Sequence, residues 1–300
     1  MIKAINATKY FDDIKAVDNV SVEIKDSAVF GMIGTNGAGK STLLRMLAGV
    51  YKPDLGTVLI DDEPVYENLN AKNKFFYISD DQYFFPNSTP EEMGKFYATV
   101  YKDFDRVKMN SLLEKFNLPE KRRISTFSKG MKKQLSVICG ICANTKYIFC
   151  DETFDGLDPV MRQAVKSIFA QEIEERGLTP VIASHNLREL EDICDHVGLL
   201  HKGDVLLSRD LDDMKGNMHK IQAAFNNTDK AEEVLKELDV VSKDIRGSLY
   251  TITVKGEVEE IRSKIEAAEP VFIEILPLNL EEIFISETEV AGYDIRKLIF

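Results

Sequence analysis

Long hydrophobic runs are missing from this 300-residue sequence. No apolar stretch approaches the roughly 20 residues that a membrane-spanning helix needs. The opening stretch, MIKAINATKYF, also lacks the apolar centre and the cleavage site of a signal peptide. We therefore expect neither a transmembrane segment nor a signal peptide.

Cysteine is scarce, and no pattern gives it a chemical role. The four cysteines are too few for a disulfide scaffold. Cys139 and Cys142 form a C-x-x-C pair, but they lie in the apolar stretch QLSVICGICAN, which predicts a helix, and no second ligand pair accompanies them. We expect buried free thiols in a reducing cytosol.

Basic residues are fewer than acidic residues in this sequence. The sequence has 38 lysines and arginines against 50 aspartates and glutamates, a net charge of −12. Phosphate backbones and anionic membranes recruit basic surfaces, so we expect no nucleic-acid partner and no non-specific adhesion to a membrane. The length predicts about two domains, and a hydrophobic content of 44% is ample for packed cores.

Strand-like and helix-like segments alternate over the first two thirds of the chain. Four short apolar runs predict buried strands: AVFGMI (28–33), KYIFC (146–150), PVIAS (180–184) and HVGLLH (196–201). Alternation with helices is typical of a mostly parallel sheet. Residues 2–33 alternate β-like runs with turns. We predict an α/β domain over residues 1–218, with an antiparallel β part and a helical subdomain inserted at about 85–145.

Residues 219–300 follow a different pattern. Six segments predict the order β-α-β-β-α-β, which is typical of a ferredoxin-like fold: KIQAAF, KAEEVLKEL, VVSKDI, LYTITV, VEEIRSKIEAA and VFIEIL. LEEIFISETE (280–289) predicts a closing helix. The unit has no glycine-rich loop, metal motif or nucleophile motif, so we predict a small α+β accessory domain for packing or dimerisation.

The stretch GTNGAGKST, residues 34–42, carries the clearest chemical signal. It fits G-x-x-x-x-G-K-[ST] between a strand and a helix, a context that disfavours a glycine turn that binds nothing. Glycines let successive N–H groups point at phosphate oxygens, and the helix N-terminus favours anions. The predicted nucleotide-binding residues are Gly34, Thr35, Asn36, Gly37, Ala38, Gly39, Lys40, Ser41 and Thr42.

Many protein families contain such a loop, and three further motifs distinguish between these families: TFSKGMKKQLSV (126–137), YIFCDETFDGLD (147–158) and VIASHNLRELEDICDHVGLLHKG (181–203). With the loop, in this order and spacing, the sequence resembles the ATP-binding cassette (ABC) ATPases over residues 1 to about 215. The form SKGMKKQ and the acidic tail are similar to the branch that powers exporters from a separate membrane permease. The resemblance implies a P-loop NTPase core that hydrolyses ATP with Mg²⁺.

Two adjacent acids end the apolar strand YIFCDE. The resemblance implies that Asp151, through water, and Ser41 hold Mg²⁺, while Glu152 polarises the attacking water and Lys40 contacts the phosphates. Two acids at a strand end can also begin a solvated turn, but the phosphate loop favours the catalytic role. His185 follows the strand PVIAS and is implied to be the switch histidine, although a lone histidine is often structural.

The motif SKGM acts, in this family, on the ATP of a second cassette. The resemblance implies that Ser128, Lys129, Gly130 and Met131 bind the γ-phosphate in trans from a helix N-terminus. A simple helix cap at Ser128 is the alternative. Lys129 replaces the usual small residue and either adds charge near the nucleotide or points to solvent.

Two more positions match the family and two depart from it. Asp158 matches the aspartate that crosses the dimer interface. Phe11 matches the aromatic residue that stacks on adenine, with Tyr10 as the neighbouring alternative. Asp80 stands where the family has a glutamine that contacts Mg²⁺, so we expect it to act as a metal ligand while metal dependence and coupling change. Thr153 replaces a proline.

The expected function is therefore the ATP-hydrolysing subunit of an ABC transporter, on the cytoplasmic face of the membrane. Two cassettes, identical or different, would close around two Mg-ATP molecules and drive a separate permease. The aromatic residues Tyr83, Phe84 and Phe85 are candidate anchors for that permease, or else a local cluster. The alternatives are a soluble ABC-type ATPase that acts on ribosomes or another macromolecule, and a module that binds nucleotide without hydrolysis.

Overall fold

The computed structural model describes residues 1–290 of the chain. Contacts divide it into two units, Met1–Ser208 and a second unit that begins at Arg209. The boundary expected after residue 218 lies inside the second unit. Among the helices of residues 1–290, none is both long and apolar enough to cross a membrane.

An antiparallel sheet forms the N-terminal part of the first unit. Its order is β2-β1-β4-β5, from β1 (Ile2–Phe11), β2 (Ile14–Ile24), β4 (Leu55–Ile60) and β5 (Glu63–Pro64). β1 and β2 form a hairpin in which Tyr10 pairs with Lys15 and Phe11 with Ile14. The tight turn is made by Asp12, whose φ is 50°, a conformation that aspartate tolerates better than most residues.

A six-stranded sheet is the centre of the first unit, in the order β10-β9-β3-β8-β7-β6. Its strands are β3 (Phe30–Ile33), β6 (Phe75–Ile78), β7 (Tyr147–Asp151), β8 (Thr179–Ser184), β9 (His196–His201) and β10 (Asp204–Asp210). β3 runs parallel to β8 and β9, and β7 runs parallel to β6 and β8. The carboxyl ends of these strands therefore meet at one edge, where ligands of such sheets bind.

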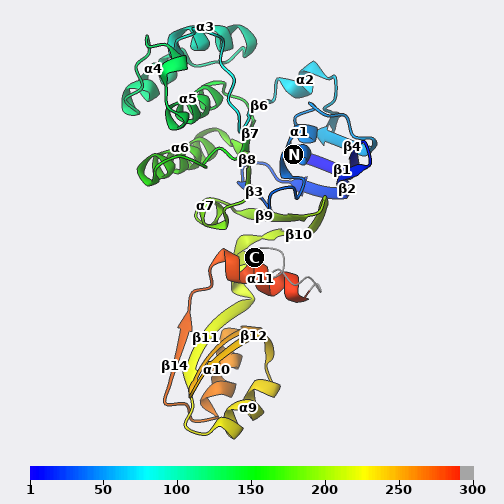
Figure 1. Ribbon diagram of the computed structural model, residues 1–300, viewed down its shortest axis with the longest axis vertical. Helices are drawn as coiled ribbons and strands as arrows, with labels where there is room; N and C mark the ends of the chain where they lie inside the picture. Colours follow the sequence, from blue (N-terminus) through cyan, green and yellow to red (C-terminus); the bar gives the residue numbers. More distant parts are fainter. Residues whose placement is uncertain (291–300) are drawn as a thin grey trace. The chain divides into compact units, whose positions relative to one another are not determined.

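The helices of the first unit include an inserted helical block. The bounds are α1 (Lys40–Leu47), α2 (Leu69–Lys72), α3 (Pro90–Val100), α4 (Arg106–Lys115), the 3₁₀ turn η1 (Ile124–Thr126), α5 (Lys129–Cys142), α6 (Pro159–Arg176) and α7 (Leu187–Glu191). In Figure 1, α3, α4 and α5 gather on one side of the central strands, while β1, β2 and β4 lie on the other. The predicted helical subdomain is thus α3 to α5.

Side chains at the start of α3 explain why the subdomain begins there. Thr89 Oγ1 accepts a hydrogen bond from the Glu92 N–H, and the Glu92 carboxylate accepts one from the Thr89 N–H. This reciprocal pair is a capping box, and Pro90 occupies the first helical position, where its missing N–H does no harm. Thr89 is therefore the N-cap of α3.

One hydrophobic core joins both sheets of the first unit to α1. It contains Leu43, Leu44, Met46 and Leu47 of α1 together with side chains from β1, β2, β3, β7 and β8. The helix that follows the phosphate loop, α1, therefore packs against both sheets. All four cysteines are free and buried, as expected, and burial raises the pKa of each thiol.

The second unit is a ferredoxin-like α+β domain, as predicted. Its sheet has the order β12-β13-β11-β14 with antiparallel pairs, and a separate core joins β11 and β13 to α9 and α10. The elements are α8 (Leu211–Gly216), β11 (Met218–Ala224), α9 (Thr228–Lys236), β12 (Asp239–Arg246), β13 (Leu249–Lys255), α10 (Val258–Glu266), β14 (Phe272–Leu276) and α11 (Leu280–Val290).

Candidate nucleotide site

The predicted phosphate loop connects β3 to α1. A Cβ on Gly34 would lie 2.4 Å from the carbonyl oxygen of Leu200, so no larger residue fits there. Gly39 has a φ of 102° and directly precedes α1, while Gly37 has a φ of 81° with open space around it. Glycine is needed at these positions because other residues avoid such backbone angles.

Lys40 is the first residue of α1, and it is only 6% exposed because its side chain reaches back to the loop. Its Nζ donates to the carbonyl oxygens of Gly34 and Thr35, at 2.7 and 3.2 Å, and lies 3.6 Å from Glu152 Oε1. Burial lowers the pKa of Lys40, and the Glu152 carboxylate opposes that shift. The ammonium is therefore held where the loop carbonyls and a carboxylate already favour a cation.

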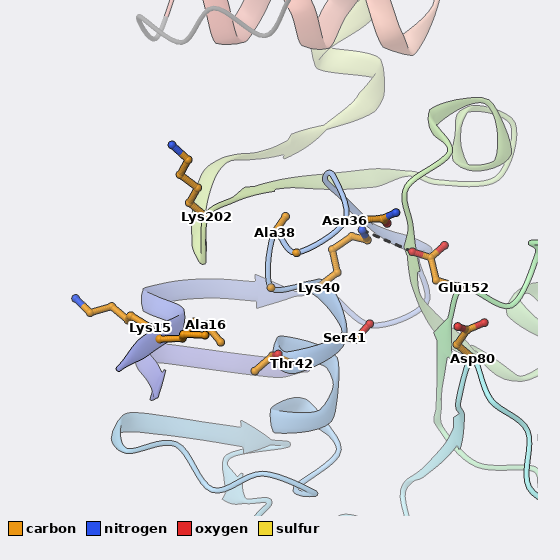
Figure 2. Close-up of a pocket in the computed structure, with 13 residues that line it drawn as sticks. Lys15, Ala16, Asn36, Ala38, Lys40, Ser41, Thr42, Asp80, Glu152 and Lys202 are labelled. Carbon is orange, nitrogen blue, oxygen red and sulfur yellow. Dashed lines mark ion pairs between the residues drawn. The ribbon is translucent and has the colours of Figure 1, made fainter. Parts of the chain in front are cut away.

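A cavity of about 600 Å³ opens over this loop. Its lining residues are Ile14, Lys15, Ala16, Asn36, Gly37, Ala38, Gly39, Lys40, Ser41, Thr42, Asp80, Glu152 and Lys202. In Figure 2, Glu152 and Asp80 lie across the loop from Lys15 and Lys202. Seven of the nine predicted loop residues thus line one cavity; the other two, Gly34 and Thr35, accept hydrogen bonds from Lys40.

Lys15 and Lys202 were missed by sequence reasoning. Lys15 is the second residue of β2, and Lys202 lies in the turn between β9 and β10. Only the fold brings these two segments to the loop. The Gly203 N–H donates to the Ala38 carbonyl at 3.0 Å, and the Asp18 N–H donates to the Gly203 carbonyl at 2.7 Å. Lys15 belongs to none of the quoted motifs, and Lys202 lies in the stretch 181–203 without an assigned role, so neither lysine was singled out from the sequence.

Asp151 and Ser41 form the part of the site that suits a divalent cation. The Ser41 hydroxyl donates to Asp151 Oδ1 at 2.8 Å, and the Tyr77 hydroxyl donates to Asp151 Oδ2 at 3.1 Å. Burial and the Asp151 carboxylate raise the pKa of Tyr77 to about 12. Hydroxyl and carboxylate oxygens are the ligands that Mg²⁺ prefers, so these residues fit the expected metal. The role of Tyr77 was not foreseen.

Glu152 turns back into the cavity from the end of β7. Its φ is 47°, a left-handed conformation that is uncommon outside glycine, and its N–H donates to the Ala183 carbonyl at 2.9 Å. His185 Nδ1 lies 2.9 Å from Glu152 Oε2, and the His185 N–H donates to the same oxygen at 3.4 Å. The structure thus brings together Lys40, Glu152 and His185, the three residues predicted to be catalytic.

Asp80 follows β6 at the cavity edge, and its side chain is 59% exposed. Its carboxylate lies 3.4 Å from Lys133 Nζ. Gln82, two positions further on, donates to the carbonyl oxygens of Ser79 and Asp80, at 2.9 and 2.7 Å. The amide of Gln82 is therefore bound to the local backbone and does not line the cavity.

The predicted signature residues lie apart from this cavity. Ser128 is the N-cap of α5, and its Oγ accepts a hydrogen bond from the Met131 N–H at 3.2 Å. Lys129 and Gly130 follow directly on the first turn, and none of these four residues lines the cavity. Their role in trans stays a prediction, as does the interface role of Asp158.

Two further predicted site residues, Asp158 and Phe11, do not line the cavity. Asp158 caps α6, with its Oδ1 accepting from the Met161 N–H at 3.0 Å. Phe11 is 38% exposed and meets Tyr51 edge-on at 5.2 Å between ring centroids. Phe11 does not itself line the cavity, although the hairpin that carries it supplies Ile14. Stacking of Phe11 on adenine stays a prediction.

The fold and the site together define a P-loop ATPase cassette with an accessory α+β domain. A family model described as ABC transporter matches residues 17–155. The ABC transporter ATP-binding protein YtrB of Bacillus subtilis (strain 168) is 31% identical over 287 residues, which cover 96% of this chain and 98% of YtrB. This chain belongs to the ABC transporter family of ATP-binding proteins.

Two further similarities agree with this family. The bacitracin transport ATP-binding protein BcrA of Bacillus licheniformis is 29% identical over 241 residues, 79% of this chain and 79% of BcrA. The dimeric structure of MJ0796, a bacterial ABC transporter cassette, has a TM-score of 0.64 at 22% identity over 70% of this chain and 99% of that one, which shows the shared fold. The chain is thus the ATP-binding subunit of an ABC transporter, an ATPase. The expected alternative, an ATPase acting on ribosomes, finds no support in these relatives.

Proposed function

We propose that this subunit hydrolyses Mg-ATP in the cavity over the phosphate loop, with Glu152 as the residue that polarises the attacking water. The observation that carries the proposal is the placement of the Glu152 carboxylate, 2.9 Å from His185 Nδ1 and 3.6 Å from Lys40 Nζ. A carboxylate that is oriented by a histidine and faces the phosphate-binding lysine can accept a hydrogen bond from a water beside the γ-phosphate.

Each residue of the site has a separate task. Lys40 and the loop N–H groups bind the phosphates, and His185 orients Glu152 and contacts the γ-phosphate. Ser41 and Asp151 hold the metal, which when bound neutralises charge on the phosphate oxygens. Asp80 lies at the cavity edge, and its carboxylate is paired with Lys133. To act as a metal ligand, as expected, Asp80 would have to bind the metal while it keeps this ion pair.

We further propose that two cassettes close around two nucleotides, each using the Ser128–Met131 segment of the other chain. A dimeric relative supports this arrangement. So does the position of α5, whose first turn exposes Ser128 and Lys129 away from the chain's own cavity. Unpaired N–H groups at a helix start favour an anion such as the γ-phosphate. Asp158 would line the same interface.

Of the three expected anchors for the membrane partner, Phe84 is half-buried in the structure. We propose that the partner binds at an aromatic patch formed by the other two, Tyr83 and Phe85, together with Phe96. Their exposed fractions are 73%, 44% and 39%, and the rings touch edge-on, with Phe85 and Phe96 at 4.7 Å between centroids. Exposed aromatic clusters mark interaction sites. The subunit would then lie on the cytoplasmic face of the membrane, attached to a permease. The SKGMKKQ form supports export, and the name of BcrA supports a role in transport.

The test of the catalytic proposal is Glu152→Gln in the purified full-length chain. We expect ATP turnover to fall at least about a hundredfold, while ATP binding and an ATP-dependent dimer persist, because only the water-polarising group is lost. Glu233→Gln, an exposed change in the second unit, is the matched control and should keep turnover within about twofold. Undiminished hydrolysis by Glu152→Gln would remove Glu152 from its assigned role.

The partner proposal is tested by tagging the chain in its native cell and identifying what co-purifies from gently solubilised membranes. We expect a polytopic membrane protein, and much less of it with the double change Tyr83→Ser and Phe85→Ser. Recovery with ribosomes, or without any membrane protein, would contradict the proposal. Uptake and efflux assays on cells lacking this chain would then establish the direction of transport.

A further inference from the structure

Lys133 of α5 is a nearly buried lysine with no role in the motifs described so far. Its side chain is 8% exposed. Nζ donates to the backbone carbonyl oxygen of Glu152 at 2.6 Å and lies 3.4 Å from Asp80 Oδ1. A buried ammonium loses its hydration, and these two oxygens replace part of it. Lys133 does not line the cavity.

The contact with Glu152 is made at a strained point of the backbone. Glu152 has a φ of 47°, and left-handed residues other than glycine persist only where their surroundings hold them. The N–H of Glu152 is fixed by the Ala183 carbonyl of β8 and its carbonyl by Lys133 of α5. The peptides on both sides of its Cα are therefore anchored, which sets the direction of the carboxylate toward His185.

We propose that Lys133 is a positioning residue that holds Glu152 in its hydrolytic geometry, and that Asp80 acts on hydrolysis through Lys133 as its counter-ion. The inference rests on the proposed role of Glu152. The Asp80 carboxylate then stabilises the Lys133 ammonium, which fixes the Glu152 carbonyl. This role is an alternative to the expected role of Asp80 as a metal ligand. Lys133 and Ser128 belong to the same helix start, so a displacement of α5 is transmitted directly to Glu152.

A purely structural role for Lys133 predicts a different result. A lysine that only supports packing would, when removed, lower stability and ATP binding together with turnover. A positioning residue acts on the chemical step, so its loss lowers kcat while the affinity of the phosphate loop for ATP is kept. The ratio between these two effects therefore separates the two roles.

The experiment compares Lys133→Met with Lys121→Met in the full-length chain, with kcat and the Kd for ATP measured for both. Lys133→Met keeps an unbranched side chain that is one atom shorter and cannot donate, so we expect kcat to fall about tenfold or more with the Kd within about twofold. Lys121→Met removes a 78% exposed charge from the same subdomain and should change neither. Lys133→Arg, which retains donors, should recover at least a third of the wild-type kcat.

Asp80→Asn completes a double-mutant cycle with Lys133→Met. We expect Asp80→Asn to lower kcat about threefold to tenfold in the wild-type chain and to have no further effect once Lys133 is methionine. A direct metal ligand would instead lower kcat equally in both backgrounds and raise the Mg²⁺ requirement. If Lys133→Met aggregates, Lys133→Leu, which likewise cannot donate, replaces it in the same cycle.

Three outcomes would overturn the proposal: a kcat within twofold of wild type for the Lys133 variant, a loss of ATP affinity as large as the loss of kcat, or additive effects with Asp80→Asn. Glu152→Gln is measured in parallel. If Glu152→Gln still hydrolyses ATP, the catalytic assignment fails and takes the positioning role with it. If Glu152→Gln is inactive while Lys133→Met is unaffected, only the positioning role fails.

Discussion

At the scale of single residues, the site depends on a few charged groups held by backbone. Lys40 is bound by the carbonyls of Gly34 and Thr35 and lies near Glu152. Its ammonium is thus placed in advance over the loop, and a nucleotide meets a charge that needs little reorganisation. The same preorganisation holds at Asp151, which receives hydrogen bonds from Ser41 and Tyr77.

Lys40→Ala should weaken nucleotide binding itself. We expect the Kd for ATP to rise at least tenfold, because the variant lacks the only buried cation among the residues that line this cavity. Isothermal calorimetry is the measurement. Lys52→Ala, an exposed lysine outside the cavity, should leave the Kd within about twofold. An unchanged affinity in Lys40→Ala would count against binding at the phosphate loop.

Tyr77→Phe should raise the Mg²⁺ concentration that half-maximal hydrolysis requires. The change removes one hydroxyl that orients the Asp151 carboxylate, and loss of such supporting hydrogen bonds commonly costs about tenfold in metal affinity. Turnover titrated with Mg²⁺ at saturating ATP checks this. Tyr66→Phe, a tyrosine that packs beside Lys52, serves as the control. A titration curve identical to wild type would show that Tyr77 does not influence the metal site.

At the scale of elements, capping decides where the helical subdomain starts. Thr89→Ala removes the hydroxyl that accepts the Glu92 N–H, so we expect the free energy of unfolding to fall by about 1 kcal/mol. Urea denaturation followed by circular dichroism measures this. Thr99→Ala on the exposed side of α3 should cost less, since its hydroxyl bonds only a carbonyl of its own helix. Equal losses for the two variants would mean that the capping box adds no stability.

Elements with continuous apolar runs could be predicted from the sequence, and so could the site residues that follow them. β9 has the bounds expected for HVGLLH, and β7 ends at the predicted Asp151. Short elements such as β5 and α2 were not foreseen, because a few residues carry too little periodicity. β10 was also missed, since its half-exposed sequence DVLLSRD lacks a continuous apolar run.

Contacts between distant segments are the part of the site that the sequence could not supply. Lys133 and Asp80 are 53 positions apart, and Tyr77 and Asp151 are 74 apart. The two members of each pair do not lie in one motif, so only the fold shows that they meet. The left-handed backbone of Glu152 is equally invisible in the sequence, because such conformations are expected at glycine. The missed residues are thus those that hold the predicted ones in place.

At the scale of the whole molecule, each unit has its own hydrophobic core, and every residue that lines the nucleotide cavity belongs to the first unit. We therefore predict that a chain ending at residue 218 folds and binds ATP with a Kd within about twofold of the full chain. This cut keeps β10 whole. Thermal unfolding and calorimetric titration of ATP are the measurements, with the full-length chain in parallel.

The result of this truncation bears on what the accessory domain does. A folded, ATP-binding fragment that still hydrolyses ATP but no longer co-purifies with the permease would assign the second unit to assembly. A fragment that loses only its ATP-dependent dimer would assign the second unit to the pairing of two cassettes. The ferredoxin-like sheet suits such a role, because its edge strands β12 and β14 can pair with another chain. Aggregation of the fragment would contradict the independence of the two cores, because a unit with a complete core buries its apolar surface without help.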